Sequence, residues 1–431
     1  MSELSAGVGI SKITPRVGTQ LVGYFNRPGG AEGVHDDLLA RAVVLDNGEL
    51  TLAICSVELL WLWSSIVAEI RQQVSRRCGL APEHILICCT HTHAGAAPHN
   101  PDDWDTPLAT RIADAIVAAY DTRQSARIGF GFGQLFGYNI NRRWLNRPAD
   151  PSVGVIRIDS SDGKPLAVIS NYACHAVVLG YDNYWISGDW PGYSSRLLEA
   201  ELGCTALYTQ GGAGDVNPLT ETVRQRLAAG HTVGTIGELT SYYGQYHKDD
   251  PAAWNIEDRG GGTFIECETL ARAFNTEVLR VWRAISTSPD VSLWTERLIV
   301  NGAAGPDEAP PEGLPPDYRG YLPEIEPGHI PLEIMLVGLD RAVLVTQPGE
   351  VFSETAVELR KTGQQMGYHF PWLVSYANGS YAYLPPANAF DEGGYEVAWG
   401  RRIGLSRHLQ DRIASAVQPV LKRRISREDK G

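Results

Sequence analysis

Short apolar runs alternate along this chain with longer segments in which apolar residues recur every three or four positions. Four of the runs have the length and composition of buried strands: HILICC (84–89), VGVIRID (153–159), LAVISNYAC (166–174) and CTALYTQ (204–210). Six segments have helical spacing: 64–79, 107–121, 192–202, 264–286, 351–366 and 402–421. Because strands and helices alternate, we predict an α/β fold that is layered, with a mixed central β-sheet flanked by helices.

Further strands are expected at 292–300 and 333–346, and Asp46-Asn47-Gly48 predicts a hairpin turn between two apolar runs. Two stretches interrupt the alternation. Residues 219–262 are polar and rich in glycine and tyrosine, and residues 302–331 hold eight prolines. We expect both to be inserted loops of a single catalytic domain over residues 1–420, followed by a solvated tail at 421–431.

The composition is that of a globular protein, with 43% hydrophobic and 20% charged residues. The net charge of −13 argues against nucleic acid as a partner, since that needs a basic face. No apolar run approaches the roughly 18 residues of a membrane span. The seven cysteines form no CxxC pair and no signal peptide is recognisable, so we expect reduced thiols and a cytoplasmic location. We also expect a small-molecule substrate, and a homo-oligomer is one option for the assembly.

Polar residues that can bind a metal follow several of the predicted strands. His91 and His93 come directly after one strand, His175 follows a second, and Glu350 follows the strand that ends near 346. In an extended segment residues i and i+2 face the same side, which would place His91 and His93 together. Active sites of α/β folds gather at the carboxyl ends of strands, and catalytic zinc takes three or four nitrogen or oxygen ligands. Each residue alone also fits a buried histidine or a helix-start carboxylate.

Several segments in order make the chain resemble the catalytic domain of the neutral/alkaline ceramidase family. They are GYFNRPGGAEGVHDD (23–37), THTHAG (90–95), GYNINR (137–142), NYACHA (171–176), GGAGDVNP (211–218), QPGE (347–350) and NGSYAYLPPANAFDEGGYE (378–396). The resemblance runs from about residue 6 to about residue 415. It implies a zinc-dependent hydrolase with the metal at the carboxyl ends of strands.

The resemblance also assigns individual roles. It implies that His91, His175, Glu350 and Tyr383 bind Zn²⁺. His93 and Arg142 match residues that bind or polarise the scissile carbonyl group. From the residues alone, Tyr383 would be taken as a strand aromatic and Arg142 as a surface cation.

One position departs from the family pattern. The family carries a serine where this chain has Asn217, and an amide is a poor nucleophile. The family also continues into a β-sandwich domain that these 431 residues do not include. We therefore expect a divergent short member, with Asn217 orienting substrate or water, and a substrate other than long-chain ceramide.

The sequence predicts a hydrolase that cleaves a C–N amide bond of a small soluble substrate by attack of zinc-bound hydroxide. An alternative is hydrolysis of a glycosidic or ester bond in a sugar derivative. That alternative is motivated by tryptophans near the motifs, half of which we expect in the core: Trp61, Trp63, Trp104, Trp144, Trp185 and Trp190. A second alternative is a non-catalytic binding protein, motivated by Asn217.

Overall fold

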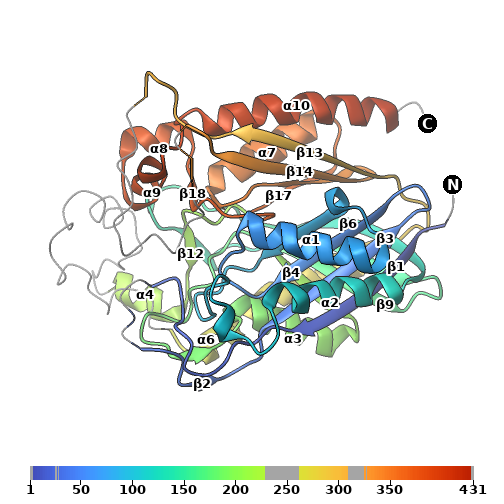
Figure 1. Ribbon diagram of the computed structural model, residues 1–431, viewed down its shortest axis with the longest axis horizontal. Coiled ribbons are helices and arrows are strands. Elements are labelled where there is room, and N and C mark those ends of the chain that lie inside the picture. Colours follow the sequence, from blue (N-terminus) through green and yellow to red (C-terminus); the bar gives the residue numbers. More distant parts are fainter. Residues whose placement is uncertain are drawn as a thin grey trace.

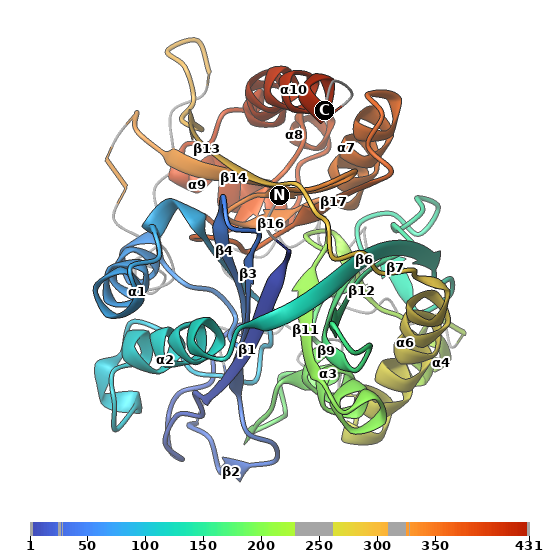
Figure 2. The same ribbon diagram turned by 90° about the vertical axis from the view of Figure 1, so that its right-hand side faces the viewer.

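The computed structural model describes residues 3–24, 27, 29–228, 262–308, 325–326 and 328–428 (Figure 1). Most of the two predicted insertions, 229–261 and 309–324, therefore lies outside the described residues. Four layers are visible end-on: helices, a first sheet, a second sheet and more helices (Figure 2). The predicted layered α/β class with a mixed central sheet is confirmed, and a second sheet is added to it.

The first sheet has eight strands in the order β11-β9-β8-β6-β1-β3-β4-β5. Their bounds are β1 Ser5–Lys12, β3 Leu39–Asp46, β4 Thr51–Val57, β5 Ile85–Cys89, β6 Gln124–Gln134, β8 Ser152–Ser160, β9 Pro165–Tyr172 and β11 Thr205–Gln210. The outer pairs β4–β5 and β9–β11 are parallel, and the strands between them are antiparallel. The hairpin predicted at Asp46-Asn47-Gly48 joins β3 to β4, with the Gly48 N–H donating to the Asp46 carboxylate at 2.8 Å.

The second sheet packs against one face of the first. Its four strands run in the order β13-β14-β15-β17, with bounds β13 Leu293–Asn301, β14 Pro331–Leu339, β15 Ala342–Thr346 and β17 Phe370–Val374. Alternate residues of β3 divide between two cores: Ala42 and Val44 face helices, whereas Val43 faces the second sheet. The central sheet is thus flanked by helices on one face only, because the other face is covered by strands.

Helices cover the two outer faces. On the first sheet, α1 (Ser64–Cys78) and α2 (Leu108–Asp121) cover one half, and α3 (Asp189–Leu202) and α6 (Phe264–Ala284) cover the other (Figure 2). On the second sheet lie α7 (Ser353–Gln365) and α10 (Leu409–Glu428). The helix ends follow sequence signals: Gly79 ends α1 in the left-handed region, and Thr263 and Glu266 form a capping box at the start of α6.

Shorter elements connect these layers and carry much of the site. They are β2 (Gly33–Val34), β7 (Asn139–Asn141), β10 (Trp185–Ile186), β12 (Val216–Pro218), β16 (Glu350–Val351), β18 (Tyr383–Leu384), α4 (Glu221–Ala228), α8 (Ala387–Glu392) and α9 (Tyr395–Ile403). None of the helices within the described ranges is long and apolar enough to cross a bilayer.

Two predictions about the C-terminal part are wrong. The helix expected over 402–421 is two helices, because Gly404 takes a left-handed conformation (φ 79°) that ends α9 before α10 begins. The solvated tail expected from 421 onward is helical to Glu428, and Leu421 and Ile425 are buried against the second sheet's core. The single-domain organisation stays a prediction, although one hydrophobic core joins both sheets.

Candidate metal centre

The site lies where strands of both sheets end. The loop after β5 carries His91 and His93, the loop after β9 carries His175, and the turn after β15 carries Glu350. Parallel pairing aligns the carboxyl ends of β9 and β11. At the end of β11, the Gln210 side chain accepts a hydrogen bond from Cys174 N–H at its Oε1 and donates one from its Nε2–H to Cys174 O. The loops are therefore fixed relative to one another by the sheets beneath them.

Three donor atoms converge in this place. The Nε2 atoms of His91 and His175 lie 3.1 Å apart, and Glu350 Oε2 lies 3.6 Å from the first and 3.3 Å from the second. A tetrahedral zinc with bonds of about 2.0–2.1 Å keeps its ligand atoms about 3.3–3.4 Å apart. In the part of the chain that the structure describes, Glu350 Oε2 is buried and receives no hydrogen bond. These donors therefore fit a bound divalent metal.

The far side of each imidazole ring is held by a backbone carbonyl. His91 Nδ1–H donates to Leu60 O at 2.8 Å, and His175 Nδ1–H donates to Ala213 O at 2.7 Å. Each bond fixes the tautomer that leaves Nε2 with a lone pair directed at the centre. Trp190 adds a hydrogen bond from its Nε1–H to the His175 carbonyl at 3.0 Å.

Burial keeps both imidazoles neutral. Desolvation lowers the pKa of His91 and of His175 to about 3, and it raises the pKa of the Glu350 carboxyl above its ordinary value. Neutral imidazole is the form that binds metals, so the two histidines are ready to act as ligands at neutral pH.

Tyr383 is placed beside Glu350 by strand pairing. The short strands β16 and β18 are parallel, with Glu350 opposite Tyr383 in the register. The phenol oxygen of Tyr383 accepts a hydrogen bond from Arg142 Nη2–H at 2.8 Å. Burial raises the pKa of this phenol well above its ordinary value. The structure thus brings the fourth predicted ligand next to the third.

Arg142 and Asn217 are also brought together, by pairing of β7 with β12. Asn217 lies opposite Ile140 in this antiparallel ladder, and Arg142 N–H donates to Asp215 O at 2.8 Å. The Arg142 side chain is buried, and its Nη1–H donates to Asn217 Oδ1 at 3.3 Å. The expectation from the residues alone, a surface cation, is wrong for Arg142.

His93 approaches the same centre from a different direction. One ring nitrogen from each of His91, His93 and His175 lies within 4.8 Å of the other two, so these three histidines could hold a metal. Within the described ranges neither His93 nitrogen has a hydrogen-bond partner. A Cβ at Gly23 would lie 2.2 Å from His93 Nδ1, so only glycine leaves room for this ring. Desolvation lowers the pKa of His93 well below its ordinary value.

The reason given for pairing His91 with His93 is wrong, although the rings do meet. His91 has a φ of 69°, so the segment is not extended and strict alternation does not apply. The two ring centroids are 4.9 Å apart and almost perpendicular. The kinked backbone at His91 brings the rings together.

A cavity of about 60 Å³ opens beside these donors. Besides His91, His93, Glu350 and Tyr383 it is lined by Gly23, Leu60, Trp61, Ser380, Ala382, Tyr395 and Trp399. Sequence reasoning missed Tyr395 and Trp399. Tyr395 belongs to the GGYE segment, which is part of the family resemblance, so membership of that segment could have marked it as a site residue.

The tryptophans proposed for sugar stacking divide between core and site. Trp104 and Trp190 are buried in separate cores, and Trp61 lines the cavity, whereas Trp185 is 45% exposed. Trp63 stacks on His99, with ring centroids 4.7 Å apart.

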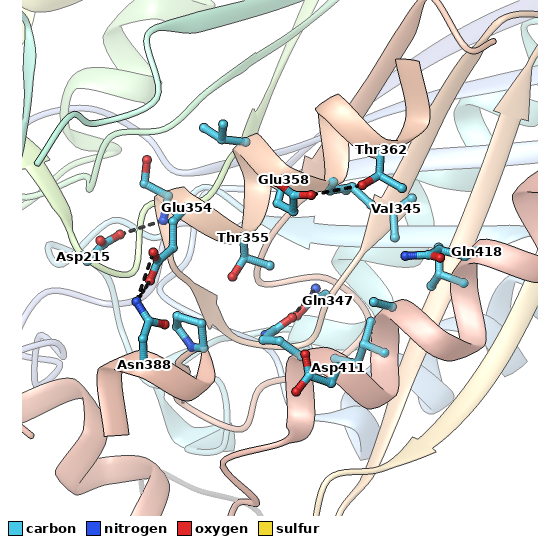
Figure 3. A pocket seen from close by; sticks show the side chains of 18 of the residues that line it. Asp215, Val345, Gln347, Glu354, Thr355, Glu358, Thr362, Asn388, Asp411 and Gln418 are labelled. Carbon is cyan, nitrogen blue, oxygen red and sulfur yellow. Dashed lines mark hydrogen bonds between the residues drawn. The ribbon is translucent and has the colours of Figure 1, made fainter. Parts of the chain in front are cut away.

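A second and larger cavity, of about 770 Å³, lies between α7 and α10 (Figure 3). Its lining includes Gln347 and Gln410, whose side-chain amides bind each other at 3.0 and 3.1 Å. Glu354 at its rim accepts hydrogen bonds from Asn388. His91 and His93 line the smaller cavity and not this one.

The sequence profile described as neutral/alkaline non-lysosomal ceramidase, N-terminal, matches residues 4–226, which is more than half of the chain. The chain belongs to the neutral/alkaline non-lysosomal ceramidase family. The matched region contains His91, His93, Arg142, His175 and Asn217. Two of the proposed ligands, Glu350 and Tyr383, lie beyond it.

Curated relatives share the family but extend further. Neutral ceramidase A of Dictyostelium discoideum is 28% identical over 51% of this chain and 36% of its own length. The neutral ceramidase of Mycobacterium tuberculosis is 24% identical over 50% of this chain and 40% of its own. The aligned part of this chain thus spans well under half of these relatives.

A solved structure shows that the family fold extends over the whole chain. The crystal structure of the neutral ceramidase from Pseudomonas aeruginosa matches 100% of this chain and 75% of that protein, with a TM-score of 0.73 at 17% identity. This likeness establishes the fold, including the second sheet, whose strands β15 and β17 precede Glu350 and Tyr383.

Proposed function

We propose that this chain is a zinc-dependent hydrolase that cleaves the amide bond of a small soluble substrate. The observation that carries the proposal is the convergence of two neutral imidazole nitrogens and one unpaired buried carboxylate oxygen within 3.1–3.6 Å. Membership of the ceramidase family supports amide hydrolysis as the reaction.

His91, His175, Glu350 and Tyr383 would hold the metal, which when bound lowers the pKa of a water and polarises a carbonyl group. Arg142 presents a buried guanidinium to this centre and would stabilise negative charge that develops on the carbonyl oxygen. His93, with both ring nitrogens unpaired in the described structure, can exchange a proton with the reacting groups.

The small substrate is supported by the site's own dimensions and by Asn217. The cavity beside the donors measures about 60 Å³, against about 770 Å³ for the cavity between α7 and α10. Asn217 Oδ1 faces Arg142 and would orient substrate or water, as an amide can both donate and accept hydrogen bonds. A cytoplasmic location and a homo-oligomeric state stay predictions.

A panel of N-acyl amides with increasing acyl length tests this function. We expect zinc-loaded protein to hydrolyse short N-acyl amides and to turn over long-chain ceramide at least about tenfold less efficiently, which corresponds to about 1.4 kcal/mol in the barrier. Efficient turnover of ceramide, or no amide hydrolysis with zinc fully bound, would refute the proposal.

Sugar derivatives are the second candidate, and one observation favours including them. Trp61 and Trp399 line the cavity, and flat aromatic faces suit sugar rings. The same panel should therefore contain N-acetylated amino sugars, sugar esters and glycosides. Cleavage of the glycosides or esters in preference to every amide would replace the proposed reaction.

A further inference from the structure

A buried carboxylate stands behind the reactive groups. Glu396 lies in the first turn of α9, is completely buried, and lines neither of the two cavities described above. One of its oxygens accepts a hydrogen bond from Arg142 Nε–H at 2.9 Å, and the other accepts one from Arg143 Nη1–H at 2.7 Å. A single carboxylate thus bridges two consecutive arginines.

The bridge fixes how Arg142 presents its guanidinium. Because the group is planar and rigid, holding Nε determines where both terminal nitrogens point. Those nitrogens donate to the Tyr383 phenol oxygen and to Asn217 Oδ1. Through Arg142, Glu396 therefore influences the orientation of Tyr383, a proposed ligand, and of Asn217, which we propose faces the substrate.

Arg143 in turn fixes Glu396. Besides binding the carboxylate, its Nη2–H donates to the Gly393 carbonyl at 2.8 Å, in the Gly393-Gly394 turn from which α9 starts. Both glycines have positive φ, at 71° and 96°, which lets the chain turn tightly before Glu396. Arg143, the neighbour of Arg142 in the chain, therefore holds the turn from which Glu396 extends.

Charge adds a second reason for a carboxylate at this position. Arg142 is a buried cation a few ångströms from the donors that would hold a divalent metal ion. Without a neighbouring anion, this cation would oppose metal binding, since Coulomb interactions are strong away from water. Glu396 offsets the charge of Arg142 through an ion pair at 2.9 Å.

We propose that Glu396 is a positioning residue of the metal centre, acting through Arg142 to orient Tyr383 and to balance charge near the bound metal. The inference rests on the hydrolase function proposed above. An alternative is that Glu396 only stabilises the start of α9, where a carboxylate favours the helix dipole.

A mutant cycle separates the two roles. The variants are Glu396→Gln, Arg142→Met, the double variant, and Glu392→Gln as a matched control. Glu392 also accepts a hydrogen bond from Arg143, at 3.3 Å, and lies only four positions earlier, but it has no bond to Arg142. The first readout is Co²⁺ affinity, measured by competition with a chelator, together with the visible spectrum of the Co²⁺ protein.

We expect Glu396→Gln to weaken Co²⁺ binding by about 10- to 100-fold and to alter the spectrum, the usual loss when a group behind the ligands is removed. Glu392→Gln should match the parent within about twofold, a free-energy difference of about 0.4 kcal/mol. In the Arg142→Met background, Glu396→Gln should have almost no further effect, because its route of action is gone.

The second readout is hydrolysis of the best amide from the panel. Glu396→Gln should lower kcat by about 10- to 100-fold and change KM little, since the remaining groups still bind the substrate. A parent that hydrolyses no amide but shows the Co²⁺ coupling rejects the hydrolase function and keeps this inference. A parent that hydrolyses amides but shows no Co²⁺ coupling keeps the hydrolase function and rejects this inference.

Two results would overturn the inference. One is a Glu396→Gln protein with the parent's Co²⁺ affinity and spectrum, or with a loss that is equally large in the Arg142→Met background. The other concerns folding: if Glu396→Gln does not fold, Glu396→Asp keeps the charge and is measured instead. Should neither fold while Glu392→Gln does, Glu396 has a folding role and the inference is wrong.

Discussion

His91 combines an uncommon backbone conformation with a buried side chain. Its φ of 69° lies in the left-handed region, which costs a residue other than glycine roughly 1–2 kcal/mol. Hydrogen bonds from its backbone N–H to Leu59 O at 2.9 Å and from its Nδ1–H to Leu60 O at 2.8 Å fix it there, and the Tyr376 ring stacks on the imidazole with ring centroids 3.9 Å apart. Strain of this kind persists where the surroundings enforce it, and it is common at functional sites.

Replacing the two histidines of the HTH segment separates ligand from catalyst. His91→Ala should lose bound zinc and activity together, because one of three converging donors is removed. His93→Ala should keep most of its zinc and lose activity by about 100-fold or more, the size expected for a proton-transfer group. Elemental analysis of both purified variants decides this. If both variants lost zinc equally, His93 would be a metal ligand and the proton-transfer role proposed for it would be wrong.

Asp189 gives a pH-dependent prediction near the His175 loop. Its carboxylate accepts hydrogen bonds from Leu179 N–H and Trp190 N–H, yet burial dominates and raises its pKa to about 6. The folded state therefore holds a proton that the unfolded chain has lost, so this group stabilises the fold increasingly as pH falls from about 6 toward 4. The slope is about 1.4 kcal/mol per pH unit.

Asp189→Asn removes this titration. As pH falls from 7 to 5, the free energy of unfolding of the parent should rise by roughly 1 kcal/mol relative to that of the variant. Urea unfolding at three pH values measures it. A difference that stays constant with pH would contradict the account of Asp189.

At the scale of elements, the sequence predicted most helices and six of the eight strands of the first sheet, since each of these carries its own periodicity and end signals. Strands β1 and β6 were not predicted from the sequence. It did not predict that β13–β15 and β17 form a separate sheet, because a buried strand reads the same whichever sheet it joins. It also ran α9 and α10 together, because the break depends on the conformation of Gly404. Pairing of β7 with β12, which buries Arg142, leaves no local signal either.

The contact between the sheets gives a prediction of its own. A Cβ at Gly154 of β8 would lie 1.7 Å from the ring of Trp372, which comes from β17 of the second sheet. Gly154→Ala should destabilise the protein by about 1–3 kcal/mol, the range for overpacking a core. Ser152→Ala on the same strand is the control. Chemical denaturation measures both, and an unchanged Gly154→Ala protein would show that the sheets are packed differently.

At the scale of the whole molecule, the centre joins the two sheets. His91 and His175 follow strands of the first sheet, whereas Glu350 follows β15 and Tyr383 follows β17, two paired strands of the second. The proposed ligands are more than 290 positions apart at the extremes, so no local pattern could have predicted that they meet; that prediction came from the family resemblance. Asn217, and Tyr395 with its neighbour Glu396, complete the site from two more segments.

Because the metal would bridge both sheets, its removal should weaken the fold. With free zinc 100- to 1,000-fold above its Kd, binding adds about 2.7–4.1 kcal/mol to the free energy of unfolding. Chelator should therefore lower the Tm of the parent and leave that of His91→Ala nearly unchanged. A parent with the same Tm in zinc and in chelator would show that metal binding and folding are not linked.

The most direct test of the central claim is an anomalous difference map at the zinc edge from crystals of the zinc-loaded protein. We predict one strong peak about 2.0–2.1 Å from His91 Nε2, His175 Nε2 and Glu350 Oε2. A peak bound by the His93 ring in place of Glu350, or no peak among these donors at full zinc loading, would contradict the account.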